Sequence, residues 1–257
     1  MTTELGRPLI IAHRGASASY PENTLAAYDG ALREGADGIE CDVRLTRDGE
    51  VVCVHDRRID RTSTGVGVVS EMTLEGLRQY DYARGKDLAE PEPIARLADL
   101  IELALDWRSK PVKLFIETKH PVRYGGMIES KVLAELQRYG LARPPSPTFA
   151  RAVVMSFAPS AIWRVRRSAP LLPTVLLGNS SLYMGGSAAT AVGATAVGPS
   201  IRTLRERPDA VDRAAASGRA TYCWTVDSLE DVEFCRDVGV DFLATNHPGR
   251  TAGWLGR

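Results

Sequence analysis

The chain has 257 residues, of which 44% are apolar and 25% are charged, as is usual for a folded globular protein. Its 32 basic and 32 acidic side chains give zero formal net charge, which argues against non-specific binding to nucleic acid or to an anionic membrane surface. No stretch reaches the roughly 18 uninterrupted apolar residues of a membrane span, and the first residues lack a signal-peptide pattern. We therefore expect a cytoplasmic protein with no nucleic-acid partner and no integral membrane segment.

Short apolar runs alternate with amphipathic helical segments along the chain. Such alternation predicts a parallel sheet with helical crossovers. About eight β/α units over this length favour a closed α/β barrel of the TIM type, (β/α)8, over an open sheet. We expect a single barrel domain over residues 1–257. The predicted strands are 8–13, 38–43, 51–55, 113–119, 152–157, 173–178, 195–200, 221–226 and 241–245, and the predicted helices are 22–35, 94–109, 125–140, 159–169, 208–218 and 229–239.

Two segments interrupt this alternation. Residues 56–93 are polar and rich in turn residues, with one short helix expected near Thr73–Tyr80. We interpret them as a small insertion at the C-terminal mouth of the barrel. Residues 178–194 are small and glycine-rich, and they predict a mobile loop or a weak helix.

Three carboxylates interrupt the predicted strands, and barrel active sites form at the C-terminal strand ends. Glu40 and Asp42 in "GIECDVR" lie two residues apart, so both face the same side of the strand. In "FIETK", Glu117 and Lys119 likewise lie two residues apart and share one face of another strand. Three such carboxylates repel one another and suit one divalent cation, Mg²⁺ or Ca²⁺, with Mn²⁺ as a further option. The alternative is an ion-pair network at the barrel mouth with Arg14 and Lys119.

Two histidines also end apolar runs, and together they favour proton transfer. An unperturbed imidazole titrates near pH 6.5, so His13 and His55 can serve as acid and base in one turnover. Arg14 and Lys119 supply fixed positive charge for an anionic substrate. Trp224, near a later strand end, is a candidate wall for that substrate. A metal, two cations and an acid/base pair together indicate phosphodiester cleavage.

Several motifs occur in order between residues 9 and 249: "HRGASASYPENT", "GIECDVRLTRDGEVVCVHD", "IETK", "CWTVD" and "LATNHPG". Together they resemble the glycerophosphodiester phosphodiesterase family. The resemblance implies a β/α barrel that uses a divalent cation to hydrolyse glycerophosphodiesters to sn-glycerol 3-phosphate and an alcohol, in lipid and glycerol metabolism. It also implies roles for individual residues: Glu40, Asp42 and Glu117 as metal ligands, His13 and His55 as the acid/base pair, and Arg14 and Lys119 as phosphate contacts.

The same resemblance implies supporting roles and a mechanism. Glu22 and Asn23 of "PENT" would brace the first helix and Arg14, and residues 56–93 correspond to the family's small insertion. Asn246 stands where the family frequently has Asp, which leaves the preference for a leaving group open. The implied mechanism is intramolecular: a glycerol hydroxyl attacks the phosphorus, and water opens the resulting cyclic phosphate. The sequence does not assign the acid and base roles between the two histidines.

Two alternatives share the barrel. A lysophospholipase D acting on lysolipids would need an apolar channel for the acyl chain at the mouth. A non-catalytic phosphodiester-binding barrel predicts loss of a histidine or carboxylate from the set, and none is missing. The sequence predicts a small-molecule substrate but neither the leaving alcohol nor the oligomeric state.

Overall fold

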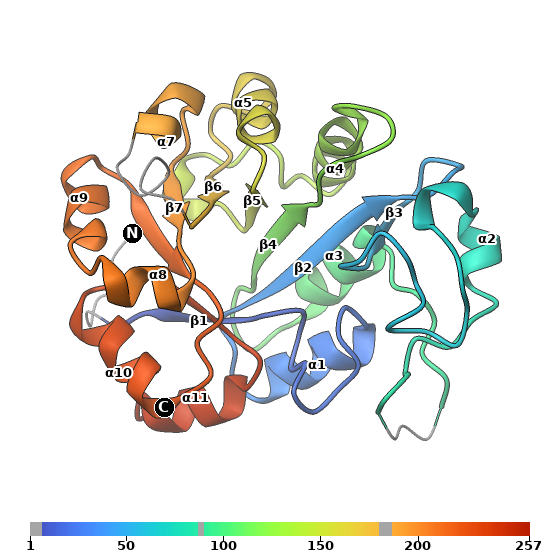
Figure 1. Cartoon of the computed structure of the whole chain (residues 1–257), viewed down its shortest axis with the longest axis horizontal. Coiled ribbons are helices and arrows are strands. Elements are labelled where there is room, and N and C mark those ends of the chain that lie inside the picture. Colours follow the sequence, from blue (N-terminus) through green and yellow to red (C-terminus); the bar gives the residue numbers. More distant parts are fainter. Residues whose placement is uncertain (1–6, 87–89, 180–186) are drawn as a thin grey trace.

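Parallel strands form a closed barrel in this computed structural model, which describes residues 7–86, 90–179 and 187–257 (Figure 1). The barrel closes because β1 (Leu9–Ala12) pairs in parallel with both β2 (Gly38–Leu45) and β9 (Phe242–Thr245). Over the described residues, eight parallel strands follow one another around the barrel, which confirms the predicted fold. Between β2 and β9 lie β4 (Lys113–Thr118), β5 (Ala152–Ser156), β6 (Thr174–Leu177), β7 (Ala196–Gly198) and β8 (Ala220–Cys223).

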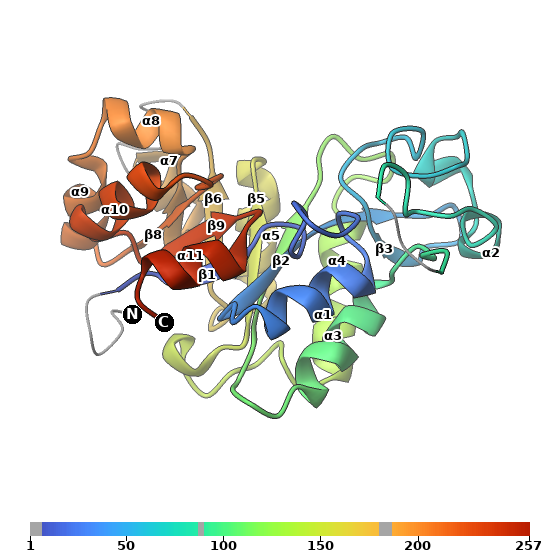
Figure 2. The same ribbon diagram turned by 90° about the horizontal axis from the view of Figure 1, so that it is seen from below.

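Helices cover the outside of the barrel (Figures 1 and 2). The first, α1 (Leu25–Arg33), begins at the N-cap Thr24, whose hydroxyl accepts a hydrogen bond from the Ala27 N–H. Two helices, α8 (Ile201–Glu206) and α11 (Pro248–Trp254), were not predicted from the sequence. The remaining bounds are α3 (Leu97–Asp106), α4 (Met127–Arg138), η2 (Pro147–Phe149), α5 (Pro159–Ser168), α7 (Ser187–Val192), α8 (Ile201–Glu206), α9 (Ala210–Ala216), α10 (Leu229–Asp237) and α11 (Pro248–Trp254).

The third predicted strand is not a barrel strand, and this part of the prediction was wrong. It forms β3 (Val51–Cys53), which runs antiparallel to β2. Only residues 46–50 join the two strands, whereas a crossover between parallel strands needs about a dozen residues or more. The short connection therefore requires β3 to run antiparallel to β2. Gly49, at a φ of 83°, turns the chain back. As a result Val54 donates its N–H to the Asp42 carbonyl, at 2.8 Å, and the chain after β3 reaches the level of the β2 carboxylates.

The described residues of the segment between β3 and α3 lie beside β3 at the edge of the barrel (Figures 1 and 2). The segment contains η1 (Val69–Glu71) and α2 (Leu74–Leu77), the latter within the predicted short helix. In the glycine-rich segment, α7 occupies the end, and the prediction for 180–186 lies outside the described residues. A small apolar cluster holds the segment to β3: Val52, Val54, Ile59, Val69, Leu74, Leu77, Tyr82 and Ile94.

Apolar side chains fill the barrel below its mouth. Phe115 on β4 is fully buried and stacks on Tyr222 with ring centroids 5.3 Å apart. Its ring also meets Phe242 edge-on at 5.1 Å. In the strand register Phe115 lies opposite Glu40, and Glu117 lies opposite Asp42, one layer closer to the mouth. The barrel therefore has an aromatic floor with carboxylates directly above it.

Candidate active site

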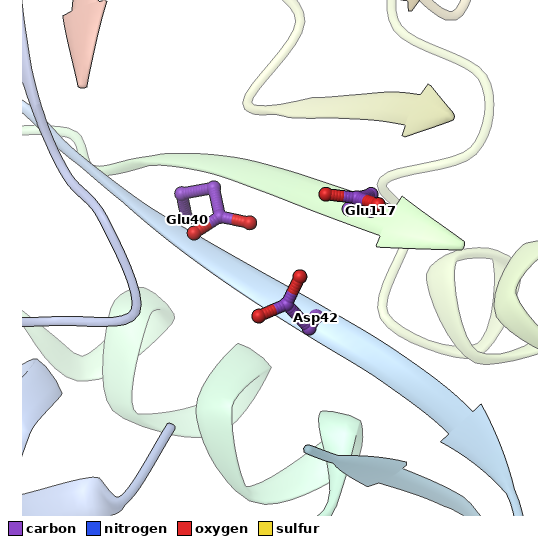
Figure 3. Close-up of side chains that lie close together, drawn as sticks. All are labelled: Glu40, Asp42 and Glu117. Carbon is purple, nitrogen blue, oxygen red and sulfur yellow. The ribbon is translucent and has the colours of Figure 1, made fainter. Parts of the chain in front are cut away.

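The three predicted carboxylates meet at one point above this floor. Figure 3 shows Glu40 and Asp42 on β2 and Glu117 on β4 with their carboxyl groups gathered between the two strands. One carboxylate oxygen from each residue lies within 4.8 Å of those of the other two. Two oxygens on opposite sides of a Ca²⁺ ion are about 5 Å apart, so a single cation can reach all three.

Burial and mutual repulsion shift the pKa values of the three carboxyl groups. Burial, together with the Asp42 charge, raises the pKa of Glu40 well above its ordinary value and that of Glu117 to about 7. Asp42 is buried as well, but Lys119 and Arg14 hold its pKa below the usual value. Its Oδ1 atom accepts no well-aligned hydrogen bond within the part of the chain that the structure describes. A crowded, oxygen-only set in which a buried oxygen has spare acceptor capacity fits a hard divalent cation.

Two cationic side chains contact the same carboxylates. Arg14 donates its backbone N–H to Glu40 Oε2 at 2.9 Å, and its Nε lies 3.0 Å from Asp42 Oδ2. Lys119 Nζ lies 2.7 Å from Glu117 Oε1 and 3.2 Å from Asp42 Oδ1. The ion-pair network that the sequence offered as an alternative is therefore present, and the same carboxylates form the cluster suited to a cation.

The backbone turn after β1 directs Arg14 toward β2. Arg14 and Gly15 both have left-handed backbone conformations, with φ values of 57° and 83°. At Gly15 a Cβ atom would lie 2.6 Å from the Cβ of Ala27, so only glycine lets α1 pack this closely. This requirement explains the glycine of the "HRG" motif as a structural residue beside two candidate site residues.

His13 is held by a chain of two side chains from later segments. Its Nδ1 lies 2.9 Å from Asn246 Oδ1, while Asn246 Nδ2 donates to Asp227 Oδ2 at 2.6 Å. Because Asp227 fixes the amide, the Asn246 oxygen faces His13, so Nδ1 is the donor and the neutral ring keeps its lone pair on Nε2. Burial, followed by the Arg14 charge, lowers the pKa of His13. We did not predict the role of Asp227, although it ends the "CWTVD" motif directly after the predicted strand 221–226.

His55 is held by a line of alternating charges. Its Nδ1 lies 2.7 Å from Asp56 Oδ1, and Arg61 Nε lies 2.6 Å from Asp56 Oδ2. Arg61 also binds Glu22 at 2.7 Å, and Glu22 contacts Arg14 Nη1 at 3.1 Å. Burial lowers the pKa of His55. The line connects His55 with Arg14 through Arg61, a residue of the segment between β3 and α3 to which the sequence assigned no role.

The "PENT" motif supports the site through Glu22 and Asn23. Glu22 braces Arg14, as the resemblance implied. Asn23 donates its backbone N–H to the Arg14 carbonyl at 3.0 Å, but its side chain binds Asp42 instead. Its Nδ2 donates to Asp42 Oδ2 at 3.1 Å, and its Oδ1 accepts from the Asp42 N–H at 3.1 Å and from the Tyr28 hydroxyl at 2.9 Å. Asn23 therefore fixes the central carboxylate of the cluster.

A cavity of about 190 Å³ opens at this point. Trp224 forms part of its wall, with its indole N–H donating to the Gly198 carbonyl at 2.9 Å and its ring edge-on to Phe157 at 5.4 Å. With Asp42 beside it, the cavity brings together all the residues singled out from the sequence. Its lining is His13, Arg14, Glu40, His55, Glu117, Lys119, Met155, Phe157, Leu177, Tyr222 and Trp224.

The model of the glycerophosphoryl diester phosphodiesterase family matches residues 13–250. The chain belongs to this family. A member from Mycobacterium tuberculosis, named "Probable glycerophosphodiester phosphodiesterase 1", is 61% identical over 256 residues, covering 97% of this chain and 93% of the relative. The glycerophosphodiester phosphodiesterase of Caldanaerobacter subterraneus is 34% identical over 244 residues, covering 94% and 95%. The family and enzyme class predicted from the sequence motifs are confirmed.

Solved structures of the family share the barrel. Glycerophosphodiester phosphodiesterase from Agrobacterium tumefaciens superposes with a TM-score of 0.80 at 24% identity, covering 96% of this chain and 99% of that one. A phosphodiesterase from Oleispira antarctica, solved with the product sn-glycerol 3-phosphate, gives 0.84 at 20% identity, with full coverage of both chains. These likenesses concern the fold.

Among the described residues, no helix has the length and apolar character needed to cross a membrane.

Proposed function

We propose that this protein, as one barrel domain with residues 56–93 inserted, hydrolyses glycerophosphodiesters to sn-glycerol 3-phosphate and an alcohol, with a divalent cation and histidine acid/base catalysis. The observation that carries the proposal is the meeting of two histidines, three carboxylates and two cations around one cavity. The names of the family relatives support the same substrate class.

The charged residues divide into two groups. Glu40, Asp42 and Glu117 would hold the cation, which when bound offsets their charge and lowers the pKa of a substrate hydroxyl. Arg14 and Lys119 bind the phosphate oxygens and stabilise the charge that builds up on them in the transition state.

The two histidines move the protons. One imidazole takes the proton from the glycerol hydroxyl next to the ester, and the oxygen attacks the phosphorus. The other imidazole protonates the alcohol as its bond to phosphorus breaks, leaving a cyclic glycerol phosphate. Water then opens the ring with the proton transfers reversed. Asn246 and Asp56 occupy Nδ1 of His13 and His55, so that Nε2 of each ring remains for the transfers.

Activity measurements test the proposal. The purified protein should release glycerol 3-phosphate from glycerophosphodiesters, lose this activity in EDTA, and regain it with added Mg²⁺, Ca²⁺ or Mn²⁺. His13→Ala and His55→Ala should each lower turnover about 10²-fold or more. His247→Ala is the matched control, because His247 lies outside the cavity lining. A rate unaffected by EDTA would contradict the metal assignment, and near-normal turnover in either histidine variant would remove that residue from catalysis.

A lysophospholipase D activity on lysolipids is the second candidate. It is favoured by the apolar side of the cavity, where Phe157 is 41% exposed beside Trp224 and could contact an acyl chain. Assays of lysophosphatidylcholine against glycerophosphocholine separate the two candidates. A non-catalytic barrel would bind these compounds and release no product.

A further inference from the structure

A second cavity, of about 330 Å³, lies outward of the catalytic one, between the inserted segment and the loop after β4. Its most prominent polar groups are the guanidiniums of Arg44, Arg57 and Arg123, and we call it the arginine pocket. Glu71 is the one carboxylate in its lining, so the lining carries a net charge of +2, from three positive charges and one negative. Val122 and Tyr124 add an apolar side that can cover a carbon skeleton.

The three arginines of this pocket lie beyond ion-pair distance of every carboxylate in the described part of the chain, although the charges of Asp42, Asp56 and Glu117 act on Arg44. Among the described residues, none of their guanidiniums forms an ion pair, whereas the neighbouring Arg58 and Arg61 are both paired. Arg44 donates to the His55 carbonyl, at 2.9 Å, and Arg123 lies over the Tyr124 ring at 5.6 Å. Unpaired positive charges that converge on a cavity favour an anionic occupant.

The chain leads directly from the catalytic cavity to the arginine pocket. Alternate residues in a strand face the same side and rise about 7 Å per pair. The two sites are therefore neighbours along β2, and their residues are also close in sequence in the chain after β3 and in the chain after β4. In each of these segments a residue of the catalytic site is followed two positions later by a residue of the arginine pocket: Asp42 by Arg44, His55 by Arg57, and Lys119 by Pro121.

We infer that the arginine pocket binds the leaving alcohol and selects glycerophosphodiesters whose alcohol carries its own phosphate or phosphodiester group. This inference rests on the proposed function, which puts the scissile phosphate at Arg14 and Lys119. On the side away from β2, the catalytic cavity is lined below its mouth by the buried side chains of Met155 on β5, Leu177 on β6 and Tyr222 on β8. The alcohol therefore extends over Arg44 into the arginine pocket, where a second anion meets Arg57 and Arg123.

A substrate series with graded charge tests the inference. Bis(glycerophospho)glycerol has an anionic leaving alcohol, glycerophosphoglycerol a neutral one and glycerophosphocholine a cationic one. We expect kcat/KM to fall in that order, with about a tenfold difference between the first and the last. Added salt should narrow the difference, because it screens the exposed arginines.

Double variants test whether the preference for an anionic leaving alcohol arises in the arginine pocket. Arg57→Ala with Arg123→Ala should reduce the ratio of kcat/KM for the anionic over the neutral substrate about tenfold, and the corresponding double lysine variant should retain most of it, since the charge is kept. Arg108→Ala with Arg143→Ala is the control: it removes the same charge from exposed positions outside both cavities. Thermal melting curves check that each variant is folded.

The outcomes distinguish a failure of the arginine-pocket inference from a failure of the proposed function. A wild-type protein that cleaves all three substrates equally, or a ratio that the Arg57/Arg123 double variant leaves unchanged, overturns the inference and leaves the proposed function standing. An equal loss of the ratio in the Arg108/Arg143 control also overturns it, because the effect would then come from net charge. If no substrate releases glycerol 3-phosphate, the proposed function fails, and the inference fails with it.

Discussion

Exchanging the two side chains behind His13 should raise the pKa of its imidazole. In the native chain an amide, Asn246, contacts His13 and a carboxylate, Asp227, lies behind it. The double variant Asp227→Asn with Asn246→Asp reverses this order. Asp227 Oδ1 accepts from the Asn246 N–H at 2.8 Å and the Thr245 hydroxyl at 3.0 Å, and an amide oxygen can do the same. The amide introduced at position 227 would then donate to the carboxylate introduced at position 246, so every donor in the chain still has an acceptor.

The magnitude follows from the distances. The negative charge moves from behind the amide to an atom 2.9 Å from His13 Nδ1. An opposite charge within about 4–6 Å shifts a pKa by about 1–3 units. Asp227 already raises the pKa of His13 slightly, as does Asp42, while burial and Arg14 lower it. We therefore expect a net rise of about 1–2 units, or about 1.4–2.7 kcal/mol in favour of the imidazolium.

Imidazole NMR titration measures this shift directly. The chain has only four histidines, so comparison with the spectrum of His13→Gln identifies the His13 signals. The pH dependence of kcat/KM should move in the same direction. Each single variant should be less stable than the double one, because it places two carboxylates or two amide N–H groups face to face. An unchanged or lowered His13 midpoint in a folded double variant would refute the reasoning about the Asp227–Asn246–His13 chain.

Three further predictions concern stability, measured by urea unfolding. Burial lowers the pKa of His13 in the folded protein, so as the pH falls the unfolded chain protonates its imidazole first. The contribution of the neutral His13 to the free energy of unfolding is therefore complete above about pH 6.5 and is lost as the pH falls through the pKa of His13 in the folded protein. His13→Gln should therefore lose less stability than the native chain between neutral pH and about pH 5, and an equal loss would contradict this. Phe115→Ala should cost about 3–5 kcal/mol by opening a cavity in the aromatic floor, and a cost below about 1 kcal/mol would argue against that packing. Glu129→Ala should cost about 3 kcal/mol, since the buried Glu129 contacts His120 at 2.6 Å and Arg164 at 3.2 Å; a neutral effect would show that these contacts add nothing.

The clustering of the three carboxylates could be predicted from the sequence because strand geometry is local. Side chains two residues apart in a strand share a face, so Glu40 and Asp42 had to project together. Parallel pairing of β2 with β4 then places the ends of these strands side by side, with Asp42 opposite Glu117. The fold class followed from the same alternation, since eight β/α units leave few other arrangements.

The supporting residues could not be predicted in the same way. His55 reaches the site through an antiparallel return of β3, and only the shortness of residues 46–50 indicated that direction. Asp227 and Arg61 act through hydrogen bonds between loops that are far apart in the chain, and no periodicity encodes such contacts. Arg61, for example, lies 39 positions from its partner Glu22.

The line of charges through Arg61 limits how this enzyme can be re-engineered. The inserted segment supplies Arg57 to the arginine pocket, and the same segment supplies Asp56 and Arg61 to the support of His55. Replacing the whole segment with that of a relative would therefore alter both the proposed alcohol site and the support of His55. A graft that keeps Asp56 and Arg61 as fixed anchor points and varies the residues between and around them can change the substrate while leaving the support of His55 in place.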